Sequence, residues 1–141
     1  MRAVLDPNVL VAALLSRSGA PAQILSRWLA GAFELVVSET LLAELESALA
    51  YPKLHPHITP GEAAEFLSLL RNGAILAPDP PARTRRSTEP ADDYLPALAE
   101  SEHAVLVSGD QHLLARKDDL PIRPARAFLK ALDAGLARPG S

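Results

Sequence analysis

The sequence contains no cysteine, and only 4% of its 141 residues are aromatic. Without cysteine, the chain forms no disulfide, no thiolate zinc site and no thiol nucleophile. With so few aromatic side chains, the core must be built from Leu, Val, Ile and Ala, since 48% of the residues are hydrophobic. At this length we expect one domain over residues 1–137, followed by a C-terminal tail at 138–141.

Long hydrophobic runs and a strong charge of one sign are also missing. No long apolar run follows a charged start, so we predict neither a signal peptide nor a membrane span. Together with the lack of cysteine, this predicts a cytoplasmic protein with no membrane partner. The net charge of −3 argues against a broadly basic protein that wraps nucleic acid. It remains compatible with an enzyme whose acidic site binds nucleic acid through metal ions.

Short apolar runs alternate with segments of helical periodicity along the chain. The runs that we predict as strands are residues 2–5, 33–37, 74–77 and 104–107, with an edge strand at 120–122. Strands that alternate with helices favour parallel pairing with helices on both faces. The sequence therefore predicts an α/β protein with three α/β/α layers and a central, mostly parallel sheet of four to five short strands.

Aspartates are expected along one edge of that sheet. Asp6 and Asp110 each follow a strand, and Asp92 and Asp93 precede a helix whose first turn must contain Pro96. Strand C-termini and helix N-termini share one edge of a parallel α/β sheet, so these carboxylates should converge. Alternatively, Asp6 could do no more than cap the helix that follows it, and the residues alone leave both interpretations open.

The helix expected at residues 39–50 adds a further carboxylate. Its apolar stripe leaves Glu44 and Glu46 on opposite flanks, each about 100° from the centre of the stripe. Glu44 lies roughly 7–8 Å along the helix from the preceding strand, which a glutamate side chain can span. Periodicity does not choose between the two glutamates.

Carboxylates that converge need a cation. Two like charges 4 Å apart repel by about 4 kcal/mol at an effective dielectric of 20. Ligands that are all oxygen specify Mg²⁺ or Mn²⁺, as one or two ions. Such a site activates water and neutralises charge on a phosphoryl group, which is nuclease chemistry. A Mg²⁺-dependent phosphatase or phosphotransferase with Asp6 as nucleophile is the catalytic alternative, although Asn8 stands where a second aspartate would be expected.

A basic cluster lies in the proline-rich segment 78–90. Arg83, Arg85 and Arg86 could steer the phosphate backbone of RNA towards the acidic edge. A solvated run of charge on a loop is the alternative, and both remain open.

Four segments together resemble the PIN domain ribonucleases, especially the single-domain toxins of bacterial and archaeal toxin–antitoxin pairs. The segments are residues 5–10 (LDPNVL), residues 38–45 with Glu44, Asp92-Asp93 ahead of 97–99 (ALA), and residues 107–110 (VSGD). They occur in the order of the family, and the resemblance covers nearly the whole chain.

The resemblance implies a PIN-like fold and a Mg²⁺- or Mn²⁺-dependent endoribonuclease that cleaves single-stranded or structured RNA. It favours Glu44 over Glu46, and Asp93 over Asp92, although Asp92 remains a candidate metal ligand. The acidic catalytic set implied in this way is Asp6, Glu44, Asp93 and Asp110, with Asn8 and Ser108 as supporting polar residues.

The same resemblance implies two protein partners. One is an antitoxin that inserts an Arg or Lys into the acidic pocket. The other is a second copy of the chain, which would form a homodimer or higher oligomer through residues 21–28 or 59–70. A catalytically degenerate PIN-fold module, whose role is to bind a partner, is the alternative from another functional class.

Overall fold

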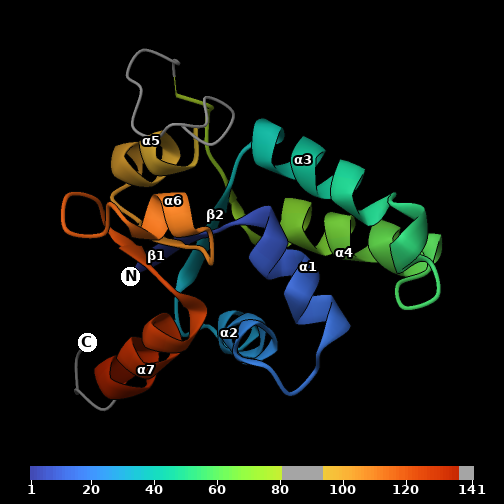
Figure 1. Ribbon diagram of the computed structural model, residues 1–141, viewed down its shortest axis with the longest axis horizontal. Helices are drawn as coiled ribbons and strands as arrows, with labels where there is room; N and C mark the ends of the chain where they lie inside the picture. The colour runs from blue at the N-terminus through green and yellow to red at the C-terminus, as the bar shows by residue number, and fades with distance from the viewer. Residues whose placement is uncertain (81–93, 137–141) are drawn as a thin grey trace.

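A five-stranded parallel sheet is the centre of the computed structural model, which describes residues 1–80 and 94–136 (Figure 1). The strands are β1 (Arg2–Leu5), β2 (Glu34–Val37), β3 (Ile75–Leu76), β4 (Val105–Val107) and β5 (Ile122–Arg123). Their order in the sheet is β3-β2-β1-β4-β5, and every pair is parallel. The predicted α/β fold with a parallel sheet is confirmed.

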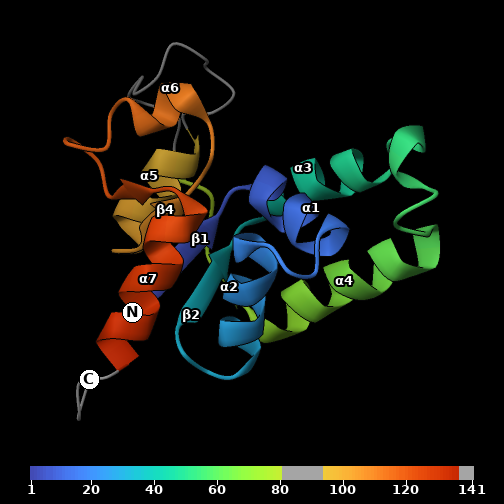
Figure 2. The same ribbon diagram turned by 60° about the horizontal axis from the view of Figure 1, so that its bottom comes forward.

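Helices surround this sheet. They are α1 (Pro7–Leu15), α2 (Ala20–Leu29), α3 (Glu39–Leu49), α4 (Pro60–Gly73), α5 (Tyr94–Ser101), α6 (Gln111–Leu114) and α7 (Ala125–Leu136), with a 3-10 turn at Pro52–Leu54. Figure 1 shows α5 and α6 on one side of the sheet and α2 and α7 on the other. The turned view of Figure 2 shows the same separation, so the layers are those expected from the alternation of strands and helices.

The core is aliphatic, as the composition predicts, and it includes several buried aromatic side chains. Ala3, Val4 and Leu5 of the central strand are buried on both faces of the sheet. Phe33 and Phe128 pack edge to face, with ring centroids 5.4 Å apart, and this contact fixes α7 beside the start of β2. Trp28 of α2 is also buried in the core.

Two predicted strands are displaced or shortened. The edge strand expected at 120–122 is instead Ile122–Arg123, because Pro121 has no N–H to donate to the ladder. The strand expected at 74–77 is reduced to Ile75–Leu76, because the Ala74 N–H bonds back to Leu70 and ends α4.

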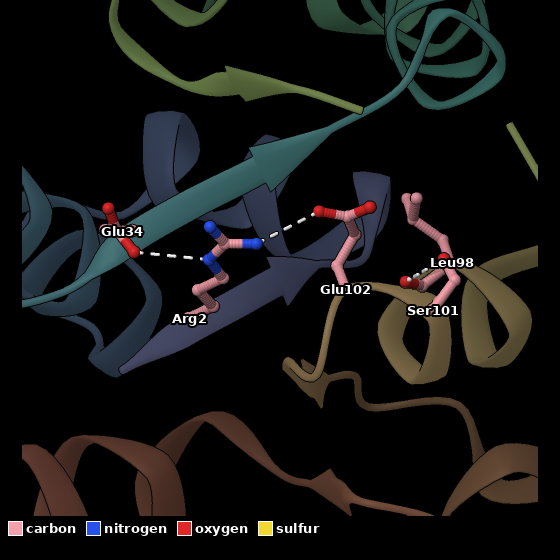
Figure 3. A network of polar contacts seen from close by, with 5 residues as sticks. All are labelled: Arg2, Glu34, Leu98, Ser101 and Glu102. Atoms are coloured by element: carbon pink, nitrogen blue, oxygen red, sulfur yellow. Dashed lines mark hydrogen bonds and ion pairs between the residues drawn. The ribbon is translucent and has the colours of Figure 1, made fainter. Parts of the chain in front are cut away.

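At the amino-terminal ends of the strands, Arg2 holds neighbouring elements together (Figure 3). Its guanidinium donates to Glu34 at the start of β2 at 3.2 Å and to Glu102 after α5 at 3.1 Å. The two glutamates at this edge of the sheet are therefore paired with Arg2. The described carboxylates of the predicted site lie at the opposite edge.

No single helix within the described residues is long and apolar enough to cross a membrane. The helices α1 and α2 reach that length only when taken together, and they are bent by 98° relative to each other.

Several predicted features lie outside the described residues. They are the candidate acids Asp92 and Asp93, the basic cluster Arg83, Arg85 and Arg86, and the tail at 138–141.

Candidate active site

Asp6 lies at the carboxyl end of β1, and its side chain is anchored on both oxygens. Its backbone N–H continues the sheet by bonding to Val107 O at 3.0 Å, and Pro7 then starts α1. Oδ1 accepts the backbone N–H of Asn8 at 2.9 Å, and Oδ2 accepts the hydroxyl of Ser108 at 2.8 Å. Asp6 thus caps α1, and its carboxylate also lies at the carboxyl edge of the sheet.

Burial dominates the electrostatics of Asp6. The residue is only 5% exposed, and this burial raises the pKa of its carboxyl above the ordinary value. The hydrogen bonds from Asn8 and Ser108 oppose that rise, and the nearby charge of Asp110 adds to it. A positive charge in this position would relieve the cost of keeping Asp6 ionised.

Ser108 links the two aspartates that end neighbouring strands. Its buried hydroxyl donates to Asp6 and accepts the backbone N–H of Asp110 at 3.0 Å. The Asp110 carboxylate in turn caps α6, where Oδ1 accepts the N–H of His112 at 2.7 Å. Asn8 acts on Asp6 through its backbone N–H, while Ser108 uses its side chain.

Glu44 and Glu46 point to different places. Glu44 lines a pocket of about 440 Å³ together with Asp6 and Asp110. Glu46 lies in a separate pocket with Glu39 and Arg71 of the α3–α4 pair. The helical periodicity correctly predicts the two flanks, and in the structure the flank with Glu44 faces the edge with the aspartates.

The pocket lies where four parts of the chain meet at the carboxyl edge of the sheet. Its lining comes from the β1–α1 junction, the exposed flank of α3, the start of α5 and the end of the loop after β4. The residues are Asp6, Pro7, Asn8, Thr40, Ala43, Glu44, Ser47, Ala48, Leu95 and Asp110.

Two residues near this pocket were not predicted from the sequence. The hydroxyl of Tyr94 donates to Oε1 of Glu44 at 2.8 Å, and burial, together with this bond, raises the pKa of the phenol. Asp79, just after β3, accepts the backbone N–H of Thr40 at 3.1 Å and so anchors the start of α3. Position after a strand was the available signal for Asp79, whereas nothing local marks Tyr94.

A divalent cation fits the chemistry of these donors. Asp6, Glu44 and Asp110 offer only oxygen, which Mg²⁺ and Mn²⁺ prefer. Among residues 1–80 and 94–136, no three His, Cys, Asp or Glu side chains are grouped so that they could hold a metal ion. The further predicted acid Asp93 lies outside the described residues and immediately precedes Tyr94 in the sequence.

A larger cavity of about 770 Å³ lies elsewhere, lined mainly by apolar residues that include Trp28, Phe33 and Leu132. Among the described residues that line it, only Glu34 carries a carboxylate, and Glu34 is already paired with Arg2. The smaller pocket is the better candidate site, because volume alone does not provide reactive groups.

A comparison with protein families matches the PIN domain over residues 2–112. The chain belongs to the PIN domain family. Members of this family are generally metal-dependent nucleases. The matched range of this PIN domain includes Asp6, Glu44 and Asp110, and it ends within α6.

Solved structures that are similar to this PIN domain include one from an archaeon and one from a bacterium. PAE2754 from Pyrobaculum aerophilum shares 20% identity at a TM-score of 0.68, over 95% of this chain and 90% of its own. VapBC2 from Rickettsia felis, solved with a DNA fragment from its promoter, contains a chain with 17% identity at a TM-score of 0.62, over 88% of this chain and 98% of its own. These likenesses support the fold. A search of curated proteins finds no match.

Proposed function

We propose that this PIN domain protein is a Mg²⁺- or Mn²⁺-dependent endoribonuclease. The observation that carries the proposal is that Asp6, Glu44 and Asp110, from three separate parts of the chain, line one pocket at the carboxyl edge of a parallel sheet. Ligand sites of open α/β sheets lie at this edge. Asp93 is proposed as the fourth acid, with Asp92 as a further candidate ligand.

Each described acid would contribute in a different way. Asp6 is immobilised by the donors Asn8 and Ser108, Asp110 is fixed to the start of α6, and Glu44 reaches in from the flank of α3. A bound divalent ion would activate water and neutralise charge on the scissile phosphate. The rigid aspartates would orient that ion. Arg83, Arg85 and Arg86 are proposed to hold the RNA backbone.

Cleavage of a fluorescent single-stranded RNA with Mn²⁺ tests this proposal. We expect Asp6→Asn and Glu44→Gln to lower the rate roughly a hundredfold or more, since a metal site supplies several kcal/mol of stabilisation. Glu46→Gln is the matched control, because it makes the same change on the same helix but in a different pocket. The control should cleave at the wild-type rate.

Other results would support the alternatives. Cleavage that survives Asp6→Asn would remove Asp6 from the site. Mn²⁺ binding without cleavage of any RNA would favour a degenerate PIN-fold binding module. Hydrolysis of a phosphomonoester that is lost in Asp6→Asn, without RNA cleavage, would favour a phosphatase or phosphotransferase.

We further propose that the protein is the toxin of a toxin–antitoxin pair. The support is its similarity in fold to a chain of VapBC2 and the acidity of its pocket, which suits an antitoxin peptide that carries Arg or Lys. Induced expression should arrest growth, and co-expression of a small upstream reading frame should restore it. Growth that is unaffected by expression of an RNA-cleaving protein would contradict the toxin role.

A homodimer is proposed from the resemblance to the same toxins. The helices expected to form it, α2 and α4, carry the exposed side chains Leu29 and Leu69, which are 59% and 40% exposed. A mass determined by light scattering should be that of two chains. A mass of one chain at high concentration would contradict this proposal.

A further inference from the structure

One hydrogen bond connects α5 to Glu44, the predicted site residue of α3. The Tyr94 hydroxyl, at the first position of α5, donates to Oε1 of Glu44 in the middle of α3 at 2.8 Å. The two residues are 50 positions apart in the sequence, so the contact exists only in the folded chain. Tyr94 also directly follows the predicted acid Asp93 in the sequence.

Glu44 needs such a contact more than the other two acids. Asp6 is buried between two donors, and Asp110 is bonded to the backbone of its own helix. Glu44 is exposed on the flank of α3 and has a longer side chain, so it loses more rotamer freedom when it is fixed in one place.

Tyr94 is suited to hold it, because its ring is anchored. The ring is half-buried and packs against the hydrophobic core. The next residue, Leu95, is 2% exposed and lines the same pocket as Glu44. A tyrosine has few side-chain rotations to lose, and its hydroxyl engages one carboxylate oxygen while the other can bind a second partner.

We propose that Tyr94 is a positioning residue that holds the Glu44 carboxylate in place at the pocket, ready to bind a divalent cation. This inference rests on the proposed function of that pocket. Tyr94 acts through Glu44 and need not touch the RNA or the metal ion itself.

The variant Tyr94→Phe tests the role, because it keeps the ring and removes only the hydroxyl. We expect Mn²⁺ affinity, measured by calorimetry on the full chain, to fall about tenfold to a hundredfold, as is typical when a residue that orients a metal ligand is lost. Tyr51→Phe is the matched control, since Tyr51 is the only other tyrosine and is 60% exposed. The control should bind Mn²⁺ as the wild type does.

A double-mutant cycle separates positioning from a general structural role. If Tyr94 acts through Glu44, then Tyr94→Phe should weaken Mn²⁺ binding in the wild type but have no further effect in a Glu44→Ala background. A merely structural loss would add to the effect of Glu44→Ala and would lower the thermal midpoint of the metal-free protein as well.

Two results would overturn the inference. They are unchanged Mn²⁺ affinity in Tyr94→Phe, and additive losses in the cycle. Because the readout is Mn²⁺ binding, the outcome differs from failure of the nuclease proposal. A wild type that binds Mn²⁺ and shows the coupling, yet cleaves no RNA, would support the role of Tyr94 and contradict the nuclease. RNA cleavage without coupling between Tyr94 and Glu44 would support the nuclease and contradict the role of Tyr94.

Discussion

Asp6 is a single residue whose buried charge suits the candidate site but lowers the stability of the folded protein. Its carboxylate is 5% exposed, and Asp110 is near enough to add to the rise in its pKa. Hydrogen bonds from Asn8 and Ser108 make this position tolerable without removing the cost of burying the charge. Functional sites commonly contain residues that lower the stability of the protein in this way.

We therefore expect Asp6→Asn to unfold at the same or a higher urea concentration than the wild type at pH 7 with a chelator present. In the folded protein the pKa of Asp6 is raised, so its contribution to stability is greatest below the unfolded value of 3.8 and is lost as the pH rises through the folded pKa. Any advantage of Asn should therefore disappear in acid.

The exposed Asp119 provides the control for this change. Asp119→Asn removes the same charge from the surface and should leave the urea midpoint unchanged at both pH values. A clear loss of stability in Asp6→Asn at pH 7 would show that the hydrogen bonds of the carboxylate outweigh its burial.

At the scale of elements, short polar side chains cap the starts of α1, α3, α4 and α6. Ser38 caps α3 by accepting the Leu41 N–H at 3.2 Å, and Asp79 accepts the N–H of the adjacent Thr40. These bonds set where α3 begins, and hence which of its residues reach the pocket. The start of α4 has a complete capping box, in which Thr59 and Glu62 bond reciprocally.

We expect Thr59→Ala to lower the free energy of unfolding by about 1 kcal/mol, because a backbone N–H at the start of α4 loses its acceptor. Removal of Glu62 should also destabilise the protein, in a manner that depends on pH. The bond from the Thr59 N–H lowers the pKa of Glu62 below its ordinary value of 4.5. Its contribution is therefore present above that value and lost as the pH falls through the folded pKa.

Urea unfolding at pH 7 and at acid pH measures both effects. The difference between the wild type and Glu62→Ala should shrink in acid. The exposed Glu65 of the same helix has no part in the box, so Glu65→Ala should show no such pH dependence. A pH-independent loss in Glu62→Ala would assign its effect to helix propensity instead.

At the scale of the whole molecule, the described fold extends beyond the family match. That match ends at residue 112. Beyond it, β5 completes the sheet, and Phe128 of α7 packs on Phe33 just before β2. The described residues after 112 therefore contribute to the same hydrophobic core.

Phe128→Ala should lower the free energy of unfolding by about 3–5 kcal/mol, the usual cost of removing a buried aromatic ring. Phe128 is 1% exposed and packs edge to face on Phe33, so the change leaves a cavity between α7 and the sheet. Lys130→Ala on the same helix is the control, since Lys130 is exposed. A small effect in Phe128→Ala would mean that α7 can detach without loss of the core.

Binding of a cation should also stabilise the whole molecule. Mn²⁺ at about a hundred times its dissociation constant would add about 2.7 kcal/mol to the free energy of unfolding. The thermal midpoint should therefore rise with Mn²⁺ concentration and return to its starting value with a chelator. Asp6→Asn should show little or no rise, and a rise equal to that of the wild type would place the metal ion elsewhere.

The sequence by itself determined the fold class, the parallel pairing and the edge at which Asp6 and Asp110 lie. These features follow from local patterns, because runs of apolar residues, prolines and capping residues act within a few positions of one another. The family resemblance singled out Glu44, which periodicity left equivalent to Glu46.

Only the tertiary structure decided which side chains meet. The contact of Tyr94 with Glu44 spans 50 positions, that of Ser108 with Asp6 spans 102, and that of Asp79 with Thr40 spans 39. Such contacts depend on the order β3-β2-β1-β4-β5, which brings β1 beside β4 and turns one flank of α3 towards them. Hydrophobic periodicity specifies the face that each element buries, but not the neighbour against which that element lies.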